Sequence, residues 1–152
     1  MEVAEKINAK IEQKLVNKNI NPTAMRILVL DLLLKQRSAI SLSDIEKGLE
    51  PADRTTIYRT LKTFEHNGLI HMIDDGTGSP KYAVCVEECD GHEHHDLHVH
   101  FYCTSCKETF CLPNSKIPDV MLPDGFISTE MNLVVKGVCD RCADQCNTIA
   151  LI

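Results

Sequence analysis

The sequence lacks any apolar run of about 18 residues, so no segment is long enough to cross a bilayer as a helix. The first residues, MEVAEKINAK, lack the apolar centre of a secretion signal, so we expect a cytoplasmic protein. Basic residues are few, because 16 Lys and Arg stand against 22 Asp and Glu, and the net charge of −6 argues against a generic nucleic-acid binder. Repeats and low-complexity segments are also absent, and a chain of 152 residues with 43% hydrophobic residues is typical of one or two folded domains.

Cysteine is missing from residues 1–84, while residues 85–152 contain all eight cysteines and five of the seven histidines. The first segment has a net charge of +1 and the second a net charge of −7. In a protein expected in the cytoplasm, so many cysteines indicate metal or redox chemistry rather than disulfides. We therefore expect a near-neutral domain at 1–84 and an acidic, ligand-rich domain at 85–152.

A helical pattern begins the first domain. Four apolar residues recur at helical spacing, namely Val3, Ile7, Ile11 and Leu15. They predict a helix from Glu2 to about Asn17. The Thr23 side chain can cap a second helix, which we expect from Ala24 to about Gln36.

Two more helices follow in the predicted order. Ser41 or Ser43 can cap a short third helix, and Ser43 with Glu46 three residues later matches the capping-box pattern. The fourth helix is expected from Arg54 to about Asn67, because Gly68 stands at a typical helix stop.

A β-hairpin is expected after the helices. The apolar stretches 69–73 and 81–84 flank a turn sequence, DDGTGSP, at residues 74–80. The last three of these helices followed by the hairpin form the winged helix-turn-helix arrangement.

The fourth helix would be the recognition helix of such a domain. Its apolar residues Ile57, Leu61 and Phe64 would face the core. Hydroxyl, phenol and basic side chains are left facing outward, namely Thr55, Thr56, Tyr58, Arg59 and Lys62. Such side chains suit contacts with phosphates and base edges in a major groove. The pattern alone equally allows a solvated helix face with no DNA-binding role.

Two CxxC pairs stand in the second domain, at Cys103 and Cys106 and at Cys139 and Cys142. Each turn can place two thiolates on one ion, and two such turns complete the closed tetrahedral four-cysteine site of structural zinc. Such a metal would join two separate segments, and the domain would depend on it for folding. The alternative is a dithiol redox motif, but a redox CxxC usually occurs once, in a βαβ setting that this sequence does not show.

Five histidines lie within residues 92–100. Because alternate residues of a strand share a face, His98, His100 and Tyr102 would point one way. Two histidines spaced in this manner can bind one metal ion together. Mixed Cys, His and acidic ligands favour zinc or iron over magnesium or calcium.

Several motifs occur in a fixed order: PTAMR at 22–26, TTIYRTL at 55–61, NGLI at 67–70, HVHFYCTSC at 98–106 and CDRC at 139–142. In order and spacing they resemble the T-x-x-R element, the recognition helix with its following turn, the His-rich strand and the zinc knuckles of the ferric uptake regulator family. The resemblance extends over about residues 10–143.

The resemblance implies an α+β fold, with an N-terminal winged helix and a small C-terminal α/β dimerisation domain. It implies a homodimer with structural zinc on the four knuckle cysteines and a regulatory metal at the hinge between the domains. Metal would set the two recognition helices to fit a palindromic double-stranded DNA operator, and the loaded dimer would repress transcription. Tyr58 and Arg59, with Arg26 of the T-x-x-R element, are the DNA contacts that the resemblance implies.

This sequence departs from the family at several ligand positions. The family's histidine ligand before the third helix is missing at residues 38–40, and its acidic regulatory ligand aligns with Cys111. Its basic minor-groove residue aligns with Asn21, and two ligands of an additional iron-sensor site align with Leu97 and Val99.

The regulatory metal is therefore expected on His98, His100 and Cys111, with Cys89 or His92 as the fourth ligand. His71 could provide the link to the DNA-binding domain in place of the missing histidine. A His/Cys site is softer than the His/carboxylate sites of iron and manganese sensors, which predicts a second zinc ion.

We thus expect a zinc-sensing repressor of metal-uptake genes. An enzyme is not expected, because the sequence shows no arrangement of nucleophile, base and orienting residue. Alternatives are a sensor of Fe²⁺, haem or peroxide in the same family, a thiol redox switch using Cys111, Cys89 or Cys146, or a zinc-stabilised interaction module. The metal assignment leaves Cys85 and Cys146 without a role.

Overall fold

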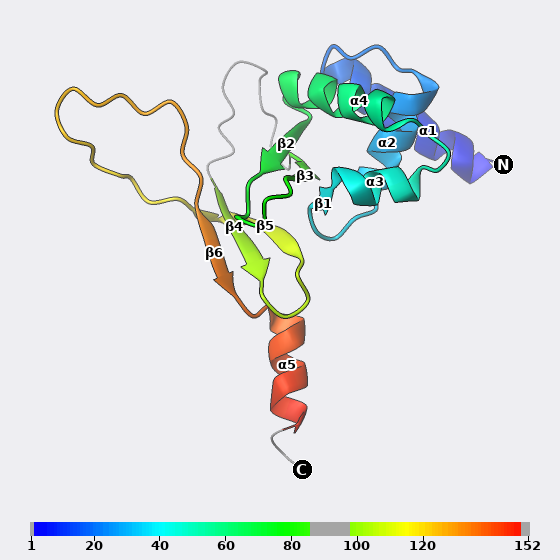
Figure 1. Cartoon of the computed structure of the whole chain (residues 1–152). Coiled ribbons are helices and arrows are strands. Elements are labelled where there is room, and N and C mark those ends of the chain that lie inside the picture. The colour runs from blue at the N-terminus through cyan, green and yellow to red at the C-terminus, as the bar shows by residue number, and fades with distance from the viewer. Residues whose placement is uncertain (1, 86–97, 150–152) are drawn as a thin grey trace.

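The computed structural model describes residues 2–85 and 98–149, and its N-terminal half consists of helices packed on a small sheet (Figure 1). The helices are α1 (Glu2–Asn17), α2 (Ala24–Leu34), α3 (Leu42–Gly48) and α4 (Arg54–His66). The sheet has the order β1-β3-β2 and comprises β1 (Ile40–Ser41), β2 (Ile70–Ile73) and β3 (Lys81–Val84). The predicted hairpin is therefore present as β2 and β3, and β1 adds a third strand that the sequence pattern did not reveal.

One apolar core holds these helices and the hairpin together. Ile57, Leu61 and Phe64 of α4 are fully buried in it, as the helical pattern predicts. The second half of α1 reaches the core, where Ile11 and Leu15 are buried. Ile7 is 45% exposed, because the start of α1 extends past the other helices (Figure 1).

The helix ends follow from local capping. Thr23 caps α2 and accepts a hydrogen bond from the backbone N–H of Arg26. Ser41, and not Ser43, caps α3, since its hydroxyl accepts from the N–H of Asp44 and donates to the Asp44 carboxylate at 2.7 Å. Gly68 follows α4 with a φ of 68°, a conformation that glycine adopts without steric cost.

The C-terminal half is a second three-stranded sheet followed by a helix. It contains β4 (His98–Cys103), β5 (Thr109–Lys116), β6 (Val134–Gly137) and α5 (Asp140–Ile149). The strand order is β5-β4-β6, with β5 antiparallel and β6 parallel to β4. These two halves confirm the expected α+β fold.

Residues 117–133 connect β5 to β6 without helix or strand and extend away from both sheets (Figure 1). We refer to this segment as the arm. A hydrogen bond of 2.8 Å from the N–H of Ala39 to the carbonyl of Thr109 joins the two halves. Among the described residues, no helix combines the length and the apolar character that a membrane crossing requires.

Candidate metal centres and nucleic-acid interface

The four knuckle cysteines converge at one end of the second sheet. Cys103 ends β4, Cys106 follows in the turn, Cys139 follows β6 and Cys142 lies in α5. Their sulfur atoms all lie within 4.8 Å of one another, and Cys106 Sγ is 3.9 Å from Cys139 Sγ. In a tetrahedral site with Zn–S bonds of about 2.3 Å, the sulfur atoms are about 3.8 Å apart. The arrangement therefore fits a zinc ion.

Within this group, backbone hydrogen bonds favour the thiolate of Cys103. Burial raises the pKa of the Cys103 thiol, but hydrogen bonds from the N–H groups of Cys106 and Cys139 outweigh burial and lower it to about 6. An N–H bond from Glu108 lowers the pKa of Cys106, while burial and the neighbouring thiols raise it, with a net value of about 12. Several thiolates this close repel one another, and a divalent cation relieves the repulsion.

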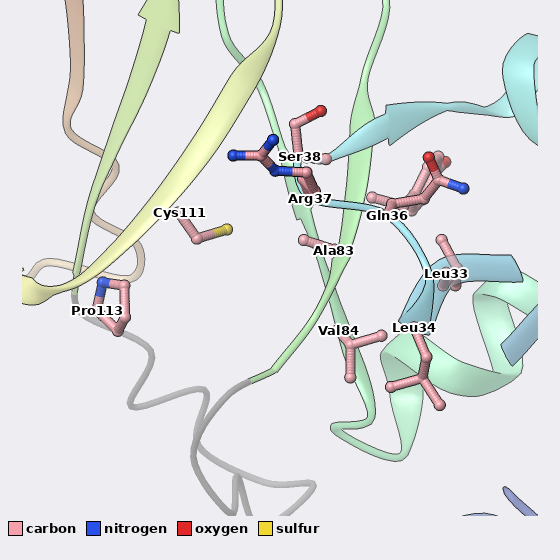
Figure 2. A pocket seen from close by; sticks show the side chains of 11 residues that line it. Leu33, Leu34, Gln36, Arg37, Ser38, Ala83, Val84, Cys111 and Pro113 are labelled. Atoms are coloured by element: carbon pink, nitrogen blue, oxygen red, sulfur yellow. The ribbon is translucent and has the colours of Figure 1, made fainter. Parts of the chain in front are cut away.

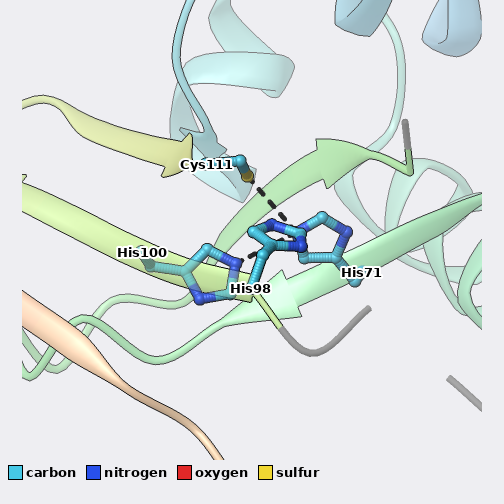
Figure 3. Close-up of side chains that lie close together, drawn as sticks. All are labelled: His71, His98, His100 and Cys111. Carbon is cyan, nitrogen blue, oxygen red and sulfur yellow. Dashed lines mark hydrogen bonds between the residues drawn. The ribbon is translucent and has the colours of Figure 1, made fainter. Parts of the chain in front are cut away.

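A second ligand cluster lies where the two halves meet (Figure 3). It consists of His71 from β2, His98 and His100 from β4, and Cys111 from β5, with their ligand atoms within 4.8 Å of one another. His71 Nε2 is 3.3 Å from both His100 Nε2 and Cys111 Sγ. Ligands of a tetrahedral zinc ion are about 3.3–3.8 Å apart. We call this group the hinge cluster.

Strand register explains how the hinge cluster forms. His100 lies directly opposite Cys111 in the β4–β5 ladder, where facing side chains are neighbours. His98 comes two residues earlier on the same face of β4. The three histidines are each less than 9% exposed, so His71 enters a site that already excludes most solvent. Imidazoles shielded from solvent in this way are suited to metal ligation.

The structure thus brings together four of the six predicted regulatory ligands. His71, predicted as the ligand that links the site to the DNA-binding domain, lies in the cluster with the other three. The other two candidates, Cys89 and His92, lie outside the described residues.

Cys85 is a neighbour of this cluster that the sequence analysis left unassigned. Its Sγ lies 3.4 Å from His71 Nδ1, the ring nitrogen on the other side from Cys111. The hairpin register contained a signal for this contact, because His71 pairs with Ala83 and Cys85 follows two residues later. Cys146, the other unassigned cysteine, belongs to α5.

A cavity of about 260 Å³ adjoins Cys111 between the two halves (Figure 2). Leu33, Arg37 and Val84 line it from the N-terminal half, and Cys111 and Pro113 line it from β5. The Cys111 thiol is accordingly only partly buried, which leaves an approach to the cluster from solvent.

The predicted DNA-contacting side chains of α4 form one exposed face, with Thr55, Thr56, Tyr58, Arg59 and Lys62 all exposed. Lys62 Nζ is 2.8 Å from the Glu65 carboxylate and lies over the Tyr58 ring. Arg26 lies apart from this face, half-buried in α2, where its guanidinium donates to the carbonyl of Asn21 at 2.7 Å.

The model of the ferric uptake regulator family matches residues 17–122, well over half of the sequence. The chain belongs to this family. Family members are dimeric, metal-responsive, DNA-binding transcriptional regulators and not enzymes.

Relatives in the family carry two kinds of name. A zinc uptake regulation protein of Mycobacterium tuberculosis is 29% identical over 119 residues, which cover 75% of this chain and 85% of the relative. A ferric uptake regulation protein of Neisseria gonorrhoeae is 29% identical over 139 residues, covering 85% and 90%. A solved zinc uptake regulator complexed with zinc and DNA has a TM-score of 0.67 at 20% identity, covering 94% of this chain and 97% of that one. At 20% identity, the similarity to this solved structure shows a shared fold.

Proposed function

We propose that this protein is a zinc-responsive repressor that controls metal-uptake genes in the cytoplasm. The hinge cluster is the observation that carries the proposal. Its ligands come from the β2–β3 hairpin, which we call the wing, and from the second sheet. A metal ion there would therefore bind both halves at once. Since the metal binds one relative arrangement of the halves best, it raises the population of that arrangement.

Zinc is the metal that the ligand chemistry of the hinge cluster favours. Three imidazoles and one thiolate make a soft donor set, and the described cluster contains no carboxylate. Zinc at the four knuckle cysteines would have a separate, structural role, because that closed set leaves no position for another ligand. The zinc uptake regulators among the relatives and solved structures support this assignment.

The proposed domains are a DNA-binding unit at 1–84 and a metal-binding and dimerisation unit at 85–152. The exposed α4 residues, with Tyr58 and Arg59 foremost, would contact a palindromic operator. Because a dimer must present two such helices, a surface of the C-terminal unit has to bind a second copy. The arm is suited to this role, since Met121, Phe126 and Ile127 are more than two-thirds exposed.

Operator binding at buffered free zinc tests the sensor role. The DNA probe is a duplex selected from random sequence by the metal-loaded protein, with zinc and Fe²⁺ used in separate selections, and the four-cysteine site stays occupied throughout. Zinc should raise the wild-type affinity for the duplex about ten-fold or more, within the usual range of allosteric coupling. His100→Ala should remove this dependence and leave the fold intact, while Tyr102→Phe on the same strand serves as the control and should respond like wild type.

The same titration with Fe²⁺ under anaerobic conditions separates zinc sensing from iron sensing. A response to iron alone would overturn the zinc assignment while keeping a metal-responsive repressor. A full zinc response in His100→Ala would place the sensor outside the hinge cluster.

A further inference from the structure

A second contact between the wing and the C-terminal sheet lies beside the hinge cluster, at Asp75. This carboxylate is only 1% exposed, although it belongs to the turn between β2 and β3. It accepts a hydrogen bond of 2.6 Å from the Thr109 hydroxyl, and Thr109 stands at the start of β5 and is itself fully buried.

The remaining partners of the Asp75 carboxylate come from the wing itself. The N–H and hydroxyl of Thr77 donate to its other oxygen. Lys81 Nζ lies 3.2 Å from the oxygen that Thr109 contacts. Together these donors compensate the charge of a carboxylate that water hardly reaches, and only the Thr109 hydroxyl among them comes from the C-terminal half.

Thr109 also forms the backbone connection between the halves. Its carbonyl accepts from the N–H of Ala39 at 2.8 Å, just before β1. One residue of β5 is therefore bonded to two separate segments of the DNA-binding half, through its hydroxyl and through its backbone.

Geometry relates this contact to the hinge cluster. Thr109 and Cys111 are two residues apart on β5, so their side chains share a face. Asp75 and His71 belong to the same hairpin. The wing therefore meets one face of β5 at two points, Asp75 with Thr109 and His71 with Cys111. Together with the Ala39–Thr109 backbone bond and a bond of 3.1 Å from the Asn132 side chain to the carbonyl of Asp74, these two points hold the wing in one orientation.

We propose that Asp75 and Thr109 are positioning residues of the sensor, which hold the wing so that His71 reaches His98, His100 and Cys111 before any metal binds. This inference rests on the proposed sensor role of the hinge cluster. Preorganisation of this kind reduces the ordering that the metal must impose, and so raises the affinity of the protein for it.

The test compares Thr109→Val, which replaces the hydroxyl by a methyl, with two matched variants. Thr109→Ser keeps the donor. Thr77→Val removes one bond to the same carboxylate without touching the contact between the halves. Two quantities are measured with the four-cysteine site loaded: the affinity of the second site for zinc, and amide hydrogen exchange of the wing and β5 before that site is filled.

Thr109→Val should bind the second zinc about ten-fold more weakly, the size expected for losing one buried hydrogen bond to a charge. Its wing and the start of β5 should exchange faster. At saturating zinc its affinity for the duplex should return to within about three-fold of wild type, because metal then supplies the orientation. Thr109→Ser and Thr77→Val should each stay close to wild type in zinc affinity.

Unchanged zinc affinity and exchange in Thr109→Val would overturn the inference, as would an equal loss in Thr109→Ser. If Thr109→Val fails to fold, Asp75→Asn tests the contact from the wing side and should shift zinc affinity in the same direction. If wild type binds no second zinc, the sensor role fails, and the exchange measurement still decides whether this contact orients the wing.

Discussion

At the scale of single residues, Cys85 shows how a side chain outside a ligand set can still determine how well the set binds metal. Once His71 Nε2 faces a metal, its Nδ1 carries a proton and needs an acceptor. Cys85 Sγ is in place to accept it, 3.4 Å away. It would take the part that a carboxylate or carbonyl usually plays behind a metal-bound histidine.

Cys85→Ala should therefore weaken zinc binding at the hinge cluster by about ten-fold or more, the range typical of such outer partners. Cys85→Ser keeps a polar acceptor and should lose less. Competition with a chromophoric chelator measures both affinities. Equal affinities in all three proteins would show that the thiol has no influence on His71.

At the scale of elements, buried residues hold the proposed recognition helix α4 in place, and its exposed residues would read the DNA sequence. Its N-terminus is fixed by Asp53, whose carboxylate accepts from the N–H of Thr56 at 2.9 Å. An ion pair of 2.6 Å between Arg54 and Glu46 links it to α3. The outward face can therefore vary without disturbing the fold.

Arg59→Ala should lower operator affinity without lowering stability, since the Arg59 side chain is exposed. If the guanidinium contacts a base, the loss of binding free energy should be about 1–3 kcal/mol, and the preference for one base at that position of the operator should weaken. If Arg59 contacts a phosphate instead, its loss should weaken binding to all DNA sequences alike. The slope of log affinity against log salt concentration should then fall by about one. Lys107→Ala, which removes one exposed charge from the C-terminal half, is the control. Wild-type binding by Arg59→Ala would remove this residue from the interface.

Elements with a local signal were predictable, and those that depend on distant pairing were not. The α1–α4 helices and the β2–β3 hairpin follow from periodicity, caps and a glycine stop. In contrast, β6 pairs in parallel with β4 across a long connection, and β1 has only two residues. Neither arrangement leaves a repeating pattern in the sequence.

The hinge cluster shows the same limit. Strand alternation indicated His98 and His100 from the sequence, and the family resemblance indicated Cys111. The contact of His71 with Cys111 and that of Asp75 with Thr109 depend on how the hairpin packs against β5. That packing joins residues about 30–40 positions apart, for which a single sequence carries no spacing rule.

At the scale of the whole molecule, the two halves differ in what stabilises them. The apolar core consists of residues from the N-terminal half. In the described part of the C-terminal half, the buried hydrophobic residues are Val99, Cys103 and Cys139, and two of these belong to the four knuckle cysteines. So small a core cannot stabilise a domain alone, which leaves metal and the second subunit to supply the difference.

Removing the knuckle metal should therefore unfold the C-terminal half and dissociate the dimer, while the N-terminal half keeps its helices. Cys103→Ser imposes this change without a chelator, because it removes one of the four proposed zinc ligands, a buried thiol to which the N–H groups of Cys106 and Cys139 donate. Hydrogen exchange should rise across residues 98–149 and stay low in α2 and α4, and sedimentation should show a monomer. Cys111→Ser removes a hinge ligand only, so it should remain a folded dimer. A folded dimeric Cys103→Ser protein would refute the structural role of this metal. Unfolding of both halves together would show that the contacts at Ala39, Asp75 and His71 couple them into one cooperative unit.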